Sequence, residues 1–167
     1  MEDKTRKFSA VYIRNFIFGV EDSLVSTVGL LSGIAAAGIS RPAILLTGII
    51  LIFVEAFSMA AGSFLSERST EEYAGRNMAT FKSPVRAGLI MFASYFISGF
   101  IPLFPYFVMN AIWAFWFSIC LSLLSLFILG LVSAKLSGAN MFRNALRMLV
   151  VGGAAIGIGV FVGNLVR

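Results

Sequence analysis

The fold is decided by residues 87–134, which read AGLIMFASYFISGFIPLFPYFVMNAIWAFWFSICLSLLSLFILGLVSA and contain no charged side chain. A helix that crosses a bilayer needs about 20 apolar residues, so this stretch is too long for one span. Proline removes a backbone donor and clashes inside a helix. We therefore expect Pro102 and Pro105 to divide the stretch into two helices, at about 85–102 and 106–134.

Three further apolar stretches flank this region. Residues 23–40 and 148–166 carry no charge, and Glu55 is the only charged residue between 42 and 66. The sequence therefore predicts an all-α, polytopic membrane protein with five transmembrane helices in a single domain, residues 1–167, with the lipid bilayer as its surroundings. The expected helices are about 15–38, 42–66, 85–102, 106–134 and 144–166, with a cytosolic linker at 67–84.

Composition removes several classes of protein. Apolar residues make up 59% of the chain and charged residues only 13%, which departs from a soluble domain in the direction of lipid. Histidine is absent and Cys120 is the only cysteine, so His-based triads, intrachain disulfides and four-cysteine metal sites are excluded. The chain has no phosphate-binding loop and no nucleophile motif, so we expect no enzyme. Its basic residues lie between apolar blocks rather than on one patch, so we expect no nucleic-acid partner.

The basic residues indicate the orientation in the membrane. Of thirteen Lys and Arg residues, eleven fall on one side of the five-helix plan and two on the other. The eleven are Lys4, Arg6, Lys7, Arg14, Arg68, Arg76, Lys82, Arg86, Lys135, Arg143 and Arg147, and the two are Arg41 and Arg167. Cytosolic loops carry the excess of Lys and Arg, so we expect a cytosolic N-terminus and an external C-terminus.

Two acids and one methionine are predicted inside the membrane. Carboxylates there are costly and therefore candidates for function. Asp22 is expected about 9 Å from the inner end of helix one, Met59 at the same depth in helix two, and Glu55 one turn further toward the exit. Carboxylate oxygens with a thioether suit a transition-metal dication better than Mg2+ or Ca2+. The alternatives are that Asp22 pairs with Arg14 or caps a helix, and that Met59 only fills space.

Two more acids, Glu67 and Glu71, follow helix two at i, i+4 spacing. One interpretation is a cytosolic entry site that collects a cation. The alternative is a solvated helix end stabilised by an Arg68–Glu72 pair at the same spacing, which spacing alone favours.

Small residues form a stripe on helix one. Gly29 and Gly33 lie in a GxxxG motif, which lets two helix backbones approach closely. One interpretation is contact with another helix of the same chain. The other is a homodimer through helix one, which would bring two copies of Asp22 together. In helix five, Gly153 and Gly157, like Gly159 and Gly163, are expected to serve close packing.

Three segments resemble the vacuolar iron transporter family. Residues 13–33, IRNFIFGVEDSLVSTVGLLSG, resemble the family's first helix, and residues 56–62, AFSMAAG, resemble part of its second. Residues 102–105, PLFP, resemble the turn between its third and fourth helices. Well-described members have the helix-two acid where this chain has Leu51, two turns before Met59, whereas Glu55 lies one turn before it.

The resemblance implies a function and a site. The family exports Fe2+, and often Mn2+, from the cytosol in exchange for protons, as a homodimer whose pathway lies between the two first helices. Asp22 matches the family's helix-one acid, Met59 its helix-two methionine, and Glu71 an acid in the cytosolic continuation of helix two. The metal and protons are cargo, so no permanently bound cofactor is expected.

A mechanism and a location follow as expectations. Buried carboxylates without a cation cannot all stay ionised, so the empty site should hold protons that an arriving dication displaces. The polar N-terminus without an extension favours a prokaryotic plasma membrane, with the vacuolar membrane as the eukaryotic counterpart. The rival interpretation is a non-transporting helical subunit of a larger membrane complex, in which Asp22 and Glu55 would be dispensable.

Overall fold

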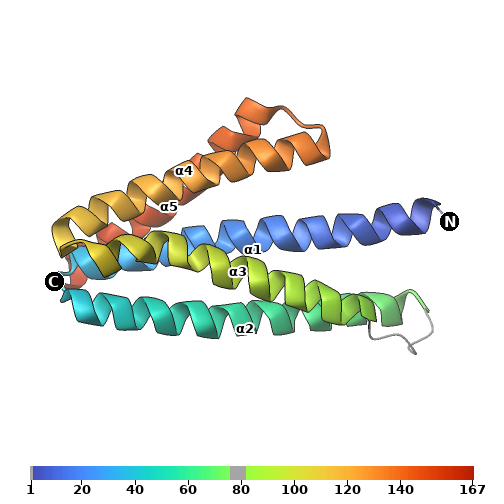
Figure 1. The fold of residues 1–167 in the computed structure, drawn as a ribbon, viewed down its shortest axis with the longest axis horizontal. Coiled ribbons are helices and arrows are strands. Elements are labelled where there is room, and N and C mark those ends of the chain that lie inside the picture. Colours follow the sequence, from blue (N-terminus) through green and yellow to red (C-terminus); the bar gives the residue numbers. More distant parts are fainter. Residues whose placement is uncertain (1, 76–81) are drawn as a thin grey trace.

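The protein is a bundle of long helices (Figure 1). The structure, a computed structural model, describes residues 2–75 and 82–167, and side chains within 10–75 and 83–167. Its helices are α1 (Glu2–Ala36), α2 (Arg41–Tyr73), α3 (Lys82–Val108), α4 (Ala111–Ser137) and α5 (Met141–Val166). Each contains an apolar stretch long enough to cross a membrane, which confirms the all-α plan with five spans. The cytosolic N-terminus and the homodimer stay predictions.

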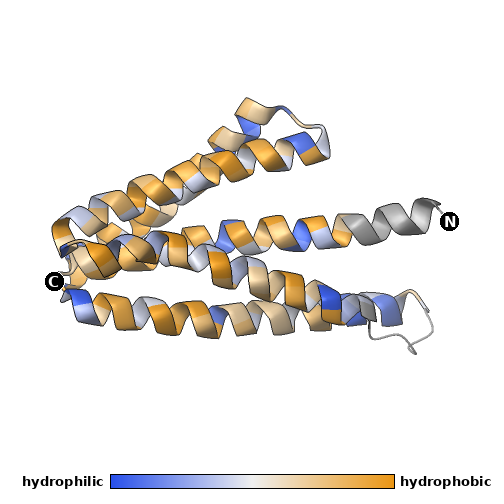
Figure 2. Cartoon of the chain, in the orientation of Figure 1, coloured by the Kyte–Doolittle hydropathy of each residue, from blue (hydrophilic) through white to orange (hydrophobic). Residues whose placement is uncertain are grey.

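The apolar side chains lie where this plan requires them. Figure 2 shows hydrophobic residues along all five helices, with hydrophilic bands near the helix ends and in the middle of α1. Many large apolar side chains face outward, among them Phe57, which is 71% exposed. Such exposure is unfavourable in water but is suited to lipid, so the surface of the bundle is that of a multi-pass membrane protein.

The break between α3 and α4 differs from the expectation. Pro102 and Pro105 lie inside α3, and the chain turns only at residues 109–110. A proline inside a helix frees the carbonyl four residues earlier, and such prolines are tolerated in membrane helices. Ser118 of α4 donates a hydrogen bond to the Pro102 carbonyl at 2.7 Å, which joins α4 to α3 at this point. The turn is set instead by Asn110, whose side chain accepts a hydrogen bond from the backbone of Trp113 as the N-cap of α4.

Two helices extend beyond the predicted spans on the side that we place in the cytosol. Helix α1 begins at Glu2 rather than near residue 15, and α2 continues to Tyr73, so residues 67–73 of the expected linker are helical. The extension of α2 is supported by the Arg68–Glu72 ion pair at 2.9 Å and by Thr70, which donates to the Ser66 carbonyl. Residues 76–81 of the linker lie outside the described part of the chain.

Helix α1 is central and contacts all four other helices, while α2 packs mainly on α3 and α5 on α1 and α4. One buried apolar cluster lies in the half nearer the C-terminus, around Leu31, Ile52 and Leu103. A second lies around Leu24 and Leu126. Between the helices lie buried serines, which bond to backbone carbonyls: Ser23, Ser94, Ser98, Ser118 and Ser122.

The glycines of α1 and α5 meet inside one chain. A Cβ on Gly33 would lie 2.8 Å from the Gly159 carbonyl oxygen, and a Cβ on Gly159 or Gly163 would overlap the carbonyl oxygen of Gly29 or Gly33. This contact confirms that Gly159 and Gly163 serve close packing. The close approach that the GxxxG motif predicts is thus made by α5 of the same chain, and the homodimer through helix one stays a prediction.

Both arginines that we place outside lie against the C-terminal end of another helix. Arg41 donates from Nε to the Tyr106 carbonyl and from Nη2 to the Phe107 carbonyl, each at 2.6 Å. The Arg167 guanidinium lies beside Gly38, just beyond the end of α1. Positive charge is favoured at a helix C-terminus, so these residues stabilise the ends of α3 and α1. The described chain ends lie at opposite ends of the bundle (Figure 1), as an odd number of spans requires.

Candidate metal site

Asp22 of α1 and Glu55 of α2 form the centre of the candidate site. Both side chains are half-buried within membrane-spanning stretches, and they are near enough to interact electrostatically. Helix α1 runs unbroken through Asp22, so the alternative of a helix cap is wrong. Among the described side chains neither carboxylate forms an ion pair, including with Arg14. Two like charges on neighbouring helices therefore lie within electrostatic range of each other, without a compensating cation among those side chains.

Helix α3 supplies a third wall through Tyr95, which is fully buried. Ser23 donates from Oγ to the Tyr95 backbone carbonyl at 2.7 Å. The Tyr95 hydroxyl and Ser26 Oγ are 2.7 Å apart, and Tyr95 interacts electrostatically with both Asp22 and Glu55. Sequence reasoning missed Tyr95, because nothing in a charge-free stretch distinguishes a tyrosine that packs near the acids from another buried tyrosine such as Tyr106.

The other predicted ligands take different places. Met59 is half-buried on α2, one turn from Glu55 on the side that we place in the cytosol. Glu67 and Glu71 are half-buried on the extension of α2, and Glu67 lies about 18 Å along the helix from Glu55. The structure therefore brings Asp22 and Glu55 together and keeps Glu67 and Glu71 apart from them. The roles of all five residues as metal ligands stay predictions.

Other acidic residues lie near this centre or on the extension of α2. Glu21 is half-buried beside Asp22 and interacts with it electrostatically, which adds negative charge to the centre of α1. The Arg68–Glu72 ion pair is present, which confirms that part of the alternative interpretation, in which the α2 extension is a solvated helix end.

Across the described residues, no three Asp, Glu or Cys side chains lie near enough together to hold a metal ion. One chain therefore offers two carboxylates within electrostatic range of each other but not a complete carboxylate cage.

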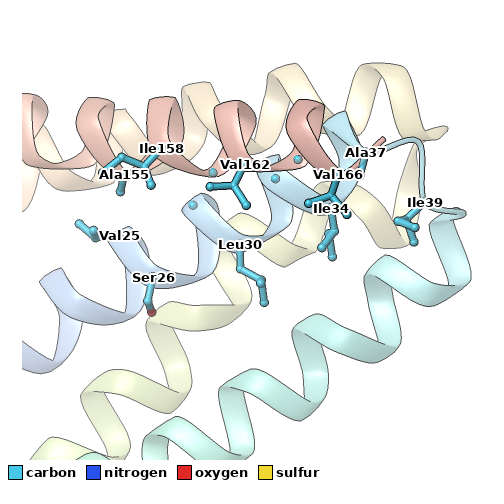
Figure 3. Close-up of a pocket in the computed structure, with 14 residues that line it drawn as sticks. Val25, Ser26, Leu30, Ile34, Ala37, Ile39, Ala155, Ile158, Val162 and Val166 are labelled. Atoms are coloured by element: carbon cyan, nitrogen blue, oxygen red, sulfur yellow. The ribbon is translucent and has the colours of Figure 1, made fainter.

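An apolar groove runs along α1 and α5 (Figure 3), with a volume of about 690 Å³. Its wall on α1 includes Ser26, Leu30 and Ile34, and its wall on α5 includes Ile158 and Val162. In Figure 3 the Ser26 side chain lies at one end of the groove with its oxygen directed toward α3. Asp22 precedes Ser26 by one helical turn, so the groove ends next to the acidic centre.

Comparison with known proteins identifies relatives over most of the chain. The model of the VIT family matches residues 13–82 and 71–164. The chain is 30% identical over 165 residues to vacuolar iron transporter homolog 1 of Oryza sativa subsp. japonica, covering 89% of this chain and 71% of the relative. It is 23% identical over 203 residues to vacuolar iron transporter 1 of Arabidopsis thaliana, covering 86% and 81%. The vacuolar iron transporter of Toxoplasma gondii is 22% identical over 228 residues, covering 95% and 76%.

Proposed function

The chain belongs to the VIT family, and from this premise we propose that it exports a divalent transition metal, Fe2+ or Mn2+, from the cytosol in exchange for protons. The relatives that match most of its length are named as iron transporters. In this proposal the metal and protons are cargo, and the protein is a carrier rather than an enzyme. The proposed location is the plasma membrane of a prokaryote, with the N-terminus in the cytosol.

The observation that carries the proposal is the juxtaposition of Asp22 and Glu55. A carboxylate inside a membrane is costly and typically lies on an ion pathway. Here two of them, from different helices, interact with each other and have no ion-pair partner among the described side chains. A dication between them would neutralise both charges. The thioether of Met59, one turn away along α2, would favour Fe2+ over Mg2+ and Ca2+.

A second copy of the chain would complete the site. One chain brings no three potential anionic ligands together in its described part, whereas a hard or borderline dication takes four or more ligands. The groove along α1 and α5 is open and apolar and ends beside Asp22, so its proposed occupant is helix α1 of a second copy. A two-fold axis there would place up to four carboxylates around one ion. The glycines would stay buried against α5 within each chain.

Exchange follows from competition for the same oxygens. Without metal, facing carboxylates in a medium of low polarity cannot all stay ionised, so the empty site would hold protons. An arriving dication binds only to deprotonated ligands and releases those protons. If the metal-bound and protonated forms each favour one side of the membrane, this competition couples metal export to proton entry.

The test is metal transport into proteoliposomes under anaerobic conditions with an imposed pH gradient. Wild-type protein should move Fe2+ only with a proton gradient, and Asp22→Asn and Glu55→Gln should each abolish this transport. Glu72→Gln on the exposed surface of α2 is the matched control and should transport normally. A double variant, Asp22→Asn with Glu55→Gln, that still transports at the wild-type rate would refute the proposal and favour the non-transporting subunit.

A further inference from the structure

A second cavity lies at the end of the bundle that we place outside the cell. It has a volume of about 470 Å³ and lies between the end of α1, the first turns of α4 and the end of α5. In Figure 1 the C-terminus lies beside the turns that join α1 to α2 and α3 to α4. Ala36, in the wall of this cavity, lies about 21 Å along α1 from Asp22. The proposed metal site therefore makes no use of it.

One side of this cavity is polar. Asn164 and Arg167 both line it, and they are three residues apart at the end of α5. The Arg167 Nε atom lies 4.0 Å from the position that a Cβ on Gly38 would take, and Gly38 lines the same cavity. Within the part of the chain that the structure describes, the side chains of Asn164 and Arg167 have no hydrogen-bond or ion-pair partner. Their N–H groups are therefore available to a ligand.

The chain has no acidic side chain that could neutralise Arg167. All eight acidic residues lie within residues 2–72, and none lies between 23 and 54. Glu55, in α2, is about 21 Å along that helix from Arg41. Arg41, the other arginine at this end, already donates to the Tyr106 and Phe107 carbonyls. The positive charge of Arg167 is thus unmatched by the side chains around it, and it attracts an anion from the surroundings.

The other side of the cavity is apolar and reaches the outer surface of the bundle. Ile112 and Trp116 of α4 line it, and they are 74% and 59% exposed. Tryptophan is enriched where a membrane meets water, which fits a position near the ends of the helices. A small inorganic anion would leave this apolar wall uncovered. A ligand that fills both sides needs a negatively charged head and an apolar tail.

We propose that this cavity binds the headgroup of an anionic phospholipid, with the phosphate on Arg167 and Asn164 and the start of an acyl chain on Ile112 and Trp116. The planar guanidinium matches the oxygens of a phosphate, and basic pockets between membrane helices bind lipid headgroups. A zwitterionic lipid is disfavoured, because its own cation would lie near Arg167. This lipid site is independent of the proposed metal transport.

The experiment uses the two tryptophans of the chain, Trp113 and Trp116, as reporters. Trp113→Phe leaves Trp116, in the wall of the cavity, as the single tryptophan. This parent protein is placed in nanodiscs of phosphatidylcholine that contain a small fraction of brominated phosphatidylglycerol or brominated phosphatidylcholine, and quenching of Trp116 fluorescence is measured. Brominated phosphatidylglycerol should quench at the lower fraction. One arginine near a membrane surface changes the affinity for anionic lipid by about fivefold, so Arg167→Gln should lower the preference by about that factor. Arg167→Lys should keep part of it.

Three further arms test the site itself. Ala111→Phe, which places a large side chain in the cavity wall, should reduce quenching by brominated phosphatidylglycerol although Arg167 is present. Arg143→Gln is the matched control, because Arg143 is also exposed but lies at the start of α5, at the other end of the bundle. It should keep the preference of the parent. Millimolar inorganic phosphate should leave quenching unchanged.

Three results would overturn the proposal. The first is equal quenching by the two brominated lipids in the parent protein. The second is an equal loss of preference in Arg167→Gln and Arg143→Gln, which would show a general attraction between charges rather than a site. The third is displacement of brominated phosphatidylglycerol by inorganic phosphate, which would identify the ligand as a soluble anion. None of these results bears on Fe2+ transport, which is measured separately in the Asp22 and Glu55 variants.

Discussion

Replacing Gly159 of α5 by alanine tests the backbone contact between α1 and α5. The added Cβ would overlap the carbonyl oxygen of Gly29, and the atoms that it meets belong to the backbone of α1. A backbone cannot rotate away as a side chain can, so the two helices would have to separate. Gly153→Ala is the matched control, because Gly153 lies in the same helix and a Cβ there meets nothing within 4 Å.

The two substitutions should have opposite signs. Alanine in a helix interior is favoured over glycine by about 1 kcal/mol, and at Gly153 this gain is unopposed. At Gly159 the same gain is set against overpacking, which costs about 1–3 kcal/mol where the surroundings can shift and more where a backbone must move. Because the gain is common to both, the free energies of unfolding of the two variants should differ by the overpacking cost, about 1–3 kcal/mol or more, with Gly153→Ala the more stable.

Thermal unfolding in detergent measures this difference. For a chain of this size, 1 kcal/mol corresponds to about 2–4 °C in Tm, so the two variants should differ by about 2–12 °C or more. Equal midpoints would show that α1 and α5 do not meet at these glycines. If Gly159→Ala instead dissociated a dimer without destabilising the monomer, the GxxxG motif would have to be assigned to a contact between two copies of the chain.

The remaining predictions concern the outer end of the bundle, the orientation and the metal preference. Arg41→Ala should lower Tm by about 2–10 °C, because two charged hydrogen bonds to the end of α3 are lost, and Arg41→Lys should recover only part of this loss. Tyr106→Phe should raise the free energy of unfolding by about 1 kcal/mol, measured by the same thermal assay, since it removes a buried hydroxyl without a described partner. Reporter fusions after Lys82 and after Arg167 should be active on opposite sides of the membrane, and activity on the same side would contradict the five-span orientation. Met59→Ala should keep Fe2+ transport but weaken its discrimination against Mg2+ in competition assays, whereas unchanged selectivity would remove the thioether from the site.

The number of helices and the acidic centre were predictable from the sequence for a simple physical reason. Lipid imposes one requirement on every span, so charge-free stretches mark the helices directly, and a carboxylate such as Asp22 or Glu55 within them is conspicuous. The exact turn between α3 and α4 was not predictable from proline. Whether Pro102 ends a helix depends on how the surrounding helices pack, and the contact between Ser118 and the Pro102 carbonyl joins residues that are distant in the sequence.

The sequence also could not show which residues pack against its small and hydroxyl-bearing side chains. The GxxxG spacing of Gly29 and Gly33 predicts that some helix approaches closely, but not whether that helix belongs to the same chain. Tyr95 shows the same limit, because its place near Asp22 and Glu55 follows from how α3 packs against α1 and α2. In both cases the pattern specifies a local surface, and only the packing of the bundle specifies what lies against it.

The paired glycines of α1 and α5 also constrain how these helices can move relative to each other. They are parallel and interlock at two points one turn apart, with a carbonyl of α1 seated in each notch of α5. Sliding along the axis would drive bulky neighbours such as Val162 into the backbone of α1, so translation is blocked while tilting about the contact is not. A tilt of about 10° about this contact would displace Asp22, about 10 Å away along α1, by about 2 Å. That distance is about the length of one metal–oxygen bond, so such a tilt would be enough to make or break coordination at the proposed site.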